Sequence, residues 1–264
     1  KYLMKRIIDK FADEAIYICE DNKFTLGTKK GSVVYNPVDT SRFKNQKTDL
    51  IKNKLGIKNT DKIILNVGGL RSINGPFVFL ESLKYIKKHI TNFKALLPLT
   101  LYEPSNSIMS KVKRKLGNLL GYYSDRQKMD MLISKNELNN NVLRFNYLDN
   151  IEELFIISDV VAIPFTKPHF ARAVLEAGAA GVPVVASDIG GISEVINHNV
   201  DGFLVKKGHA EGLAKSVIKC LSNQQEIIDM RNVAFKKVNK YFNVEAHVLN
   251  IIDIYKKIIY NDGI

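Results

Sequence analysis

The sequence KPHFARAVLEAGAAGVPVVASDIGGISEVI, residues 167–196, decides the fold. An apolar segment, VVAIPF at 160–165, precedes it, and a second one, PVVAS at 183–187, lies within it. Between the two segments, residues 170–180 have the spacing of a helix, and the glycines at 190–191 indicate a turn. Strands that are apolar throughout and alternate with helices are typical of a parallel sheet covered by helices on both faces.

The same alternation continues on both sides of this stretch. Further strands are predicted at 62–68, 93–99, 142–147 and 202–205. Further helices are predicted at 76–90, 125–137, 151–157 and 209–221, followed by two terminal helical stretches. The expected fold class is α/β, with a doubly wound, Rossmann-like parallel sheet. Because ligands of such sheets bind beyond the carboxyl ends of the strands, the informative loops are 68–75, 97–124, 146–150, 165–170 and 187–194.

The first part of the chain has a different organisation. Residues 1–15 have helical spacing and residues 15–19 are strand-like. A turn at Asn36-Pro37 and a helix-start signal at Asp39 or Thr40 are typical of a linker into a new domain. Since the chain opens on Lys1 with a segment typical of the middle of a protein, we expect a fragment of a longer protein.

The bulk composition narrows the function classes. Lys and Arg exceed Asp and Glu by 39 to 27, a net charge of +12, which favours polyanionic partners such as phosphorylated sugars, anionic lipid or nucleic acid. No RNP-type aromatic box, zinc finger or helix-turn-helix accompanies the charge, which argues against nucleic acid. No apolar run is long enough to span a bilayer and no signal peptide opens the chain, so we expect a cytoplasmic location. Cys19 and Cys220 lie far apart and are expected to be buried, reduced thiols.

Two local patterns point to chemistry. The sequence VGGLRSINGP at 67–76 combines glycines after a strand with a helix start, which suits a phosphate, although an ordinary turn would use the same glycines. No GxG occurs, so a dinucleotide fingerprint is missing and NAD is disfavoured. Glu176 lies among Ala177, Gly178 and Ala179, and a carboxylate in such an apolar setting needs a partner. Ribose hydroxyls and backbone amides would both satisfy it.

Five pieces in order resemble the C-terminal domain of the family-four retaining glycosyltransferases of GT-B fold. In chain order they are the entry segment 36–39 with Phe43, Val67-Gly68 with Gly75, Leu175-Glu176-Ala177, Gly181 with 183–187, and Gly190-Gly191 with Glu194. Phe242 with Tyr255 also resembles the closing helices of the family. The resemblance implies that residues 1–30 are the remnant of an N-terminal acceptor domain and linker. It implies a nucleotide-sugar-binding domain at 31–240 and a returning helix at 241–264.

The resemblance also implies a site. Glu176 would hold the ribose of a UDP- or GDP-linked sugar, and residues near Asn146, Tyr147 and Leu148 would meet the base. The diphosphate would be faced by the glycine loop and by the amides at the start of the following helix, at Gly68, Gly69, Arg71, Asn74, Gly75, His169, Phe170, Ala171 and Arg172. No metal or other cofactor is expected, and no DxD occurs. The reaction would be glycosyl transfer with retention to a glycan, polysaccharide or glycolipid.

Three departures from the family pattern affect the charged end of the donor. Gly69 stands where the family has arginine, Asn74 where it has lysine, and Pro168 where it has the first motif glutamate. Losing one preorganised charge contact costs about two to three orders of magnitude in rate. Arg71 and Arg172 are candidate compensating cations, with solvated surface arginines as the alternative. His169 fits a turn residue better than an acid or base.

Residues 107–120 combine helical apolar spacing with four basic residues. They suit peripheral contact with a membrane surface, although an inserted helix packed on its own domain is favoured. Two alternatives to a transferase half stay open: a degenerate, non-catalytic GT-B module acting as a partner or regulatory domain, and a sugar-nucleotide epimerase. Even as a transferase half, the fragment is expected to be inactive alone, and apolar surface is expected to be exposed near residues 1–30 and 241–260.

Overall fold

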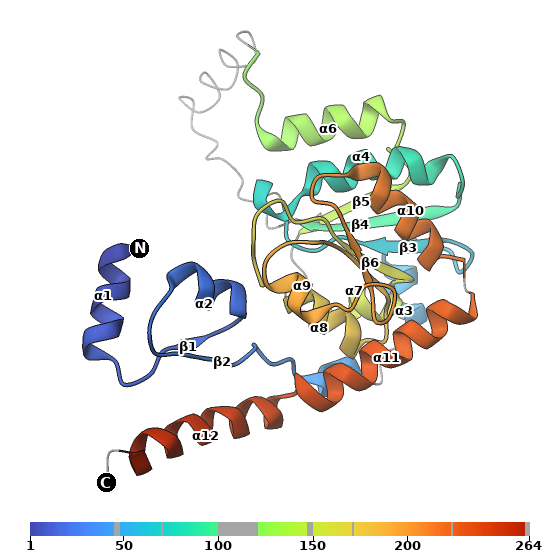
Figure 1. Ribbon diagram of the computed structural model, residues 1–264. Helices are drawn as coiled ribbons and strands as arrows, with labels where there is room; N and C mark the ends of the chain where they lie inside the picture. Colours follow the sequence, from blue (N-terminus) through green and yellow to red (C-terminus); the bar gives the residue numbers. More distant parts are fainter. Residues whose placement is uncertain are drawn as a thin grey trace.

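The computed structural model describes residues 1–44, 48–69, 71–99, 121–146, 150–170, 172–222 and 224–261. Figure 1 shows an α/β domain with a smaller N-terminal unit beside it and a long C-terminal helix below both. The domain is built on a six-stranded sheet. Its strands are β3 (Lys62–Leu65), β4 (Phe93–Leu99), β5 (Val142–Asn146), β6 (Val160–Ile163), β7 (Val184–Ser187) and β8 (Phe203–Val205).

The strand order is β5-β4-β3-β6-β7-β8, and every neighbouring pair is parallel. The chain therefore builds the sheet outward from β3 in one direction, then returns to add β6 on the other side. The order reverses between β3 and β6, which is the switch point where ligands of doubly wound sheets bind. The predicted α/β fold class is confirmed.

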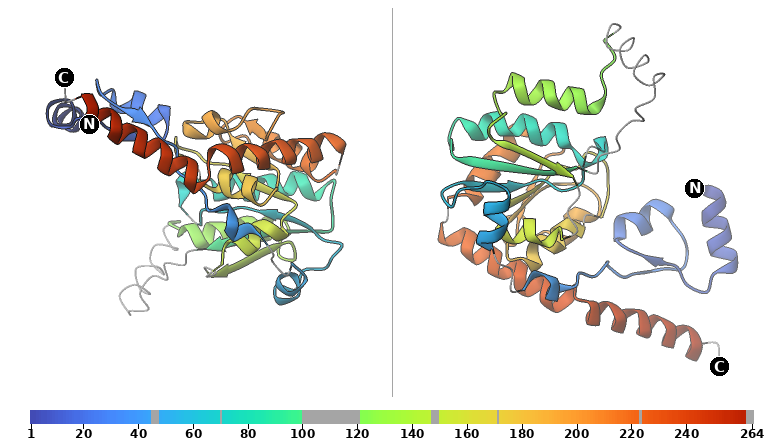
Figure 2. Two further views of the ribbon diagram at one scale, coloured as in Figure 1. Left: turned by 90° about the horizontal axis from the view of Figure 1, so that it is seen from below. Right: turned by 180° about the vertical axis from the view of Figure 1, so that it is seen from behind.

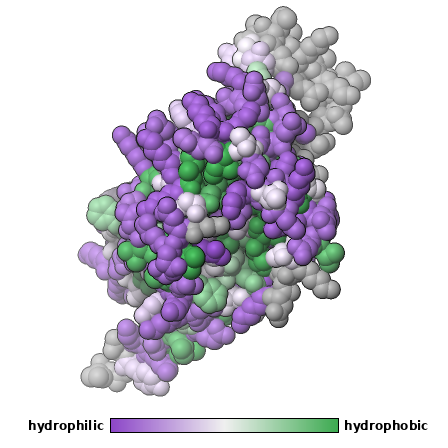
Figure 3. Space-filling model, turned by 90° about the vertical axis from the view of Figure 1, so that its right-hand side faces the viewer, coloured by the Kyte–Doolittle hydropathy of each residue, from purple (hydrophilic) through white to green (hydrophobic). Residues whose placement is uncertain are grey.

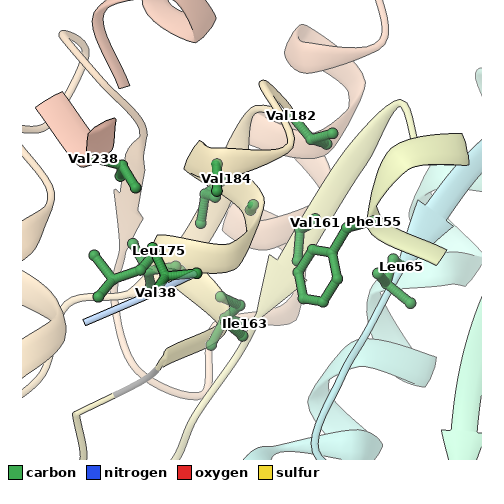
Figure 4. Close-up of a cluster of buried hydrophobic side chains, with 14 of the residues drawn as sticks. Val38, Leu65, Phe155, Val161, Ile163, Leu175, Val182, Val184 and Val238 are labelled. Carbon is green, nitrogen blue, oxygen red and sulfur yellow. The ribbon is translucent and has the colours of Figure 1, made fainter. Parts of the chain in front are cut away.

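Helices cover both faces of the sheet. One face is covered by α4 (Pro76–Lys87), α6 (Asp125–Lys135) and α10 (Ala210–Cys220), and Ile64 of β3 packs toward them. The opposite face is covered by α3 (Thr48–Lys54), α7 (Glu152–Ile157), α8 (Arg172–Ala179) and α9 (Gly191–Val195). The helix α11 (Gln225–Tyr241) contributes Ile227 and Met230 to the first core and Val238 to the core of this face. Leu65, the next residue of β3, lies in this second core with Phe155 and Leu175 (Figure 4). Successive strand residues pack into opposite cores because side chains alternate between the two faces of a strand.

Residues 1–33 form the N-terminal unit. It contains α1 (Tyr2–Phe11), β1 (Ile16–Tyr17), α2 (Glu20–Leu26) and β2 (Ser32–Val33), and β1 pairs with β2 in parallel. The predicted division of the chain after residue 30 stays a prediction. The strand β2, which begins at Ser32, pairs with β1 of the N-terminal unit.

The last helix, α12 (Val244–Asn261), extends from the end of α11 past the N-terminal unit (Figures 1 and 2). Ser32 of β2 and Ile254 and Lys257 of α12 line a common groove. The segment after β2 is bonded to the segment between α11 and α12, since the Val38 amide donates to the Phe242 carbonyl at 2.8 Å. No helix within the described residues is long and apolar enough to cross a bilayer.

The predicted exposure of apolar surface near both ends is confirmed. None of the α1 side chains is buried. Large apolar side chains exposed on α1 and α12 are Tyr2, Leu3, Met4, Ile7, Phe11, Val244, Val248, Leu249, Ile252, Tyr255, Ile259 and Tyr260. On the face at the right of Figure 1, hydrophilic residues dominate and apolar residues lie between them (Figure 3). The apolar side chains of the two terminal helices thus lack the cover that the sheet provides elsewhere.

The differences from the sequence-based expectations concern short elements. The helix-start signal at Asp39 begins only a single turn, η1 (Thr40–Phe43), in which the Asp39 carboxylate accepts from the Ser41 amide at 3.0 Å. The helices α2, α3 and α9 lie where no helix was predicted. Helices of seven residues or fewer are too short to display a reliable hydrophobic period, and tertiary contacts stabilise them.

Both thiols are expected to resist modification in the native chain. Cys19 and Cys220 are buried, and burial raises the pKa of Cys19 and raises the pKa of Cys220 to about 12. Because the thiolate is the reactive form, an aromatic disulfide reagent at pH 8 should react at least about 100-fold more slowly than in guanidinium chloride. Immediate reaction of either thiol in the folded chain would contradict this expectation.

Candidate functional site

The loop after β3 is held in shape by its own asparagine. Gly68 has a φ of +126°, and a Cβ there would lie 2.9 Å from the Asn74 side chain. The Asn74 amide is buried and donates to the Gly68 carbonyl. The residue that stands in the place of the family's lysine therefore folds back and closes the loop. Gly69, with a φ of +66°, follows in the left-handed conformation that favours glycine.

The same loop is tied to the loop after β6, across the switch point. A short turn, η2 (Ser72–Asn74), leads to Gly75, and the Thr166 amide donates to the Ile73 carbonyl at 2.8 Å. A Cβ on Gly75 would lie 1.8 Å from the Pro164 carbonyl oxygen, so only glycine fits there. Two of the predicted site loops thus form one joined edge. Arg71 lies exposed on this edge.

The residues that precede α8 pack against the double glycine that follows β7. A Cβ on Gly190 would lie 3.0 Å from the Pro168 Cβ and 3.2 Å from the His169 nitrogen. His169 is exposed and its ring lies 5.6 Å from the Phe165 ring. This geometry agrees with a turn residue. Phe170, by contrast, is buried, with its ring stacked 6.0 Å from the Tyr35 ring.

Glu176 lies in α8, one helical turn after Arg172. Its side chain is 17% exposed, and Oε1 pairs with the Arg172 guanidinium at 3.2 Å. Burial raises the pKa of the Glu176 carboxyl, and Arg172 opposes that shift. Arg172 pairs with Glu176 while its own side chain stays 64% exposed.

Sequence reasoning missed two further charges near Glu176. Arg42 of η1 pairs with Glu152 at the start of α7 at 2.6 Å, and the Glu152 side chain is only 7% exposed. Both groups act on the Glu176 carboxyl, since Glu152 raises its pKa and Arg42 lowers it. No sequence period connects these residues, which come from the linker, α7 and α8.

The remaining predicted residues are placed only in part. Asn146 ends β5 beside Leu99 of β4, at the carboxyl edge of the sheet. Tyr147, Leu148, Ala171 and the predicted amphipathic segment at 107–120 lie outside the described residues. Within the described ranges, no group of three or more His, Cys, Asp or Glu side chains could hold a metal ion.

Comparison with known families agrees with this architecture. Residues 108–237 match the family model of the group 1 glycosyl transferases. The chain is 25% identical over 245 residues, 93% of its length, to N-acetyl-alpha-D-glucosaminyl L-malate synthase of Bacillus anthracis. It is 26% identical over 234 residues to the UDP-Gal:alpha-D-GlcNAc-diphosphoundecaprenol alpha-1,3-galactosyltransferase of Escherichia coli. The chain spans 58% and 55% of the lengths of these two relatives.

Solved structures share the fold. A glycosyltransferase from Rickettsia africae superimposes with a TM-score of 0.84 at 22% identity, covering 99% of this chain and 68% of that one. The Anabaena protein Alr3699/HepE, in complex with UDP and glucose, gives a TM-score of 0.81 at 21% identity, covering 97% and 66%. The domain thus has the doubly wound, Rossmann-like fold that the sequence predicted for the C-terminal half of a GT-B protein.

Proposed function

From the match of residues 108–237 to the group 1 glycosyl transferases, we propose that this chain is the nucleotide-sugar-binding half of a glycosyltransferase. The carrying observation is Glu176, a carboxylate that is 17% exposed beside the switch point, with Arg172 as its described ion-pair partner. A carboxylate in this setting accepts hydrogen bonds from a pair of hydroxyls, and a ribose presents such a pair at fixed spacing. Glu176 would then orient the nucleotide.

The loops at the switch point supply the rest of the proposed site. In this proposal the diphosphate approaches the backbone between Gly68 and Gly75, and the start of α4 adds the positive end of a helix. Because Asn74 is turned into the loop, Arg71 is the cation of this loop that would offset the charge of the leaving nucleoside diphosphate. Arg172 would contribute once a ribose replaces it as the partner of Glu176.

The proposed reaction is transfer of a glycosyl group to a glycan, polysaccharide or glycolipid, with retained configuration. Nucleoside diphosphate leaves, and preorganised amides and Arg71 stabilise the charge that develops on it. The acceptor would lie between this domain and an N-terminal half, to which residues 1–30 would belong, with residues 241–264 returning to that half. A cytoplasmic location, with peripheral membrane contact through 107–120, completes the proposal.

Calorimetric titration of the chain with UDP, GDP and ADP tests the proposal. We expect saturable binding of one nucleotide, and UDP is the first to test because the Anabaena neighbour is in complex with UDP. Binding of that nucleotide without added divalent metal is also expected, since in this proposal the chain's own amides and cations face the diphosphate. Absence of binding by all three, from a chain shown to be folded by circular dichroism, would instead favour a non-catalytic partner module.

A further inference from the structure

The helix α2 of the N-terminal unit depends on a residue of the large domain. It has seven residues, and isolated helices shorter than about 12 residues are marginal in water. Its own N-cap residue, Cys19, makes no side-chain capping bond. The first turn of α2 therefore needs an acceptor from elsewhere in the chain.

Glu194 of α9 supplies that acceptor. Its Oε2 accepts from the Glu20 amide at 2.7 Å and its Oε1 from the Asp21 amide at 2.8 Å, across 174 and 173 residues of sequence. A carboxylate at a helix N-terminus satisfies free amides and interacts favourably with the helix dipole. Both oxygens are used, so the carboxylate binds the turn in one orientation.

Tyr35 makes the contact continuous with the predicted site. Its hydroxyl donates to Glu194 Oε2 at 3.1 Å, and its ring stacks on Phe170. Burial, and then the hydrogen bond to the Glu194 carboxylate, raises the pKa of Tyr35 to about 12, so the hydroxyl is the donor in this bond. Tyr35 thereby joins Glu194 to the loop that precedes α8.

Close packing at the double glycine completes the junction. A Cβ on Gly191 would lie 2.9 Å from the Cys19 Cβ and 3.1 Å from Phe170 Cδ2. Gly191 at the start of α9 is therefore packed closely against Cys19, which precedes α2, and against Phe170, which precedes α8. The helix α2 lies beside α9 (Figure 1).

We propose that Glu194 is a positioning residue that docks the N-terminal unit onto the loops at 165–170 and 188–191. The docking sets the orientation of this unit relative to the carboxyl edge of the sheet. The consequence for catalysis rests on the proposed function. The Glu194 carboxylate would then join the loop that faces the diphosphate to the unit that belongs to the acceptor half.

Hydrogen exchange of the full, ligand-free chain tests the contact itself. We expect the amides of Glu20 and Asp21 to exchange about tenfold faster in Glu194→Ala, because a lost cap typically costs about a factor of ten in helix stability. Glu194→Gln keeps one acceptor oxygen and should fall between wild type and Glu194→Ala. Glu245→Ala, which removes an exposed carboxylate from the first turn of α12, is the matched control and should leave α2 unchanged.

A distance measurement separates positioning from simple capping. Spin labels at Phe24→Cys, on an 89% exposed position of α2, and at exposed Ser134→Cys on α6 report the orientation of the unit, since the native thiols are buried. We expect one narrow distance distribution with Glu194 present and a broad one in Glu194→Ala.

Two results would overturn the proposal: exchange in Glu194→Ala that matches the control, or faster exchange with an unchanged distance distribution. Both readouts use the ligand-free chain, so they stand apart from the nucleotide titration. Failure of UDP, GDP and ADP to bind would remove the proposed function and leave the docking result as measured.

Discussion

Replacing Glu176 by alanine should weaken nucleotide binding by about 10- to 100-fold. The estimate follows from the loss of hydrogen bonds to a charged group, worth about 1.5–3 kcal/mol. Calorimetric titration of wild type and Glu176→Ala with the same nucleotide measures the ratio of dissociation constants. The matched control is Glu211→Ala, because Glu211 also pairs with a basic residue four positions away but lies on the exposed surface of α10. Equal affinities of wild type and Glu176→Ala would remove Glu176 from the site.

The same carboxylate should cost the folded protein stability when no nucleotide is added. Burial raises the pKa of Glu176 in the folded chain, so its stabilising contribution is complete below the unfolded pKa and is lost as pH rises through the folded pKa. At pH 7, Glu176→Gln should therefore unfold at the same or a higher temperature than wild type, while binding nucleotide more weakly. Wild type should have a lower melting temperature at pH 7 than at pH 5. This difference should be smaller in Glu176→Gln, because the variant has no carboxyl group to ionise at this position. A glutamine variant that is clearly less stable at pH 7 would show that the ionised carboxylate stabilises the fold.

Gly75→Ala should destabilise the domain by about 3–5 kcal/mol, which is a large loss for a single substitution. Two effects add. The residue has a φ of +67°, where a Cβ costs about 1–2 kcal/mol, and its Cβ would lie 1.8 Å from the Pro164 carbonyl oxygen. The loops after β3 and β6 would have to separate, at the edge where the nucleotide is proposed to bind.

Gly181→Ala is the matched control for this effect. Gly181 has a φ of +65°, but a Cβ there would meet nothing within 4 Å, so only the backbone strain of about 1–2 kcal/mol should appear. Urea unfolding at constant m-value gives both free energies of unfolding. Equal losses in the two variants would mean that the close approach of the two loops contributes nothing to stability.

Several features of the site could be read from local sequence. Gly75-Pro76 at a strand-to-helix turn and the double glycine at 190–191 are informative because Gly75 and Gly190 have positive φ angles, which turn sequences indicate locally. Glu176 was recognisable because an isolated carboxylate in an apolar helix segment needs a partner. The nature of that partner was open, and the structure shows an ion pair with Arg172.

Other site residues were predicted from the family resemblance, and the side-chain contacts in the structure indicate different roles for two of them. Asn74 stands where the family has a cation, yet its amide is bonded to the Gly68 carbonyl and shapes the loop. Phe170 marks the start of the α8 segment, but its ring packs on Tyr35 at the junction with the N-terminal unit. A one-dimensional motif gives the position of such a residue and not the direction of its side chain.

The sequence by itself determined the α/β class and the alternation of strands and helices, because hydrophobic period and turn residues act over a few neighbouring positions. Only the tertiary structure decided that Arg42 and Glu152 lie beside Glu176, and that Glu194 caps a helix 174 residues away. Those contacts follow from the strand order and from which helix covers which face. Ion pairs and caps between distant residues leave no period in the sequence, since their partners become neighbours only when the sheet and its helices have assembled.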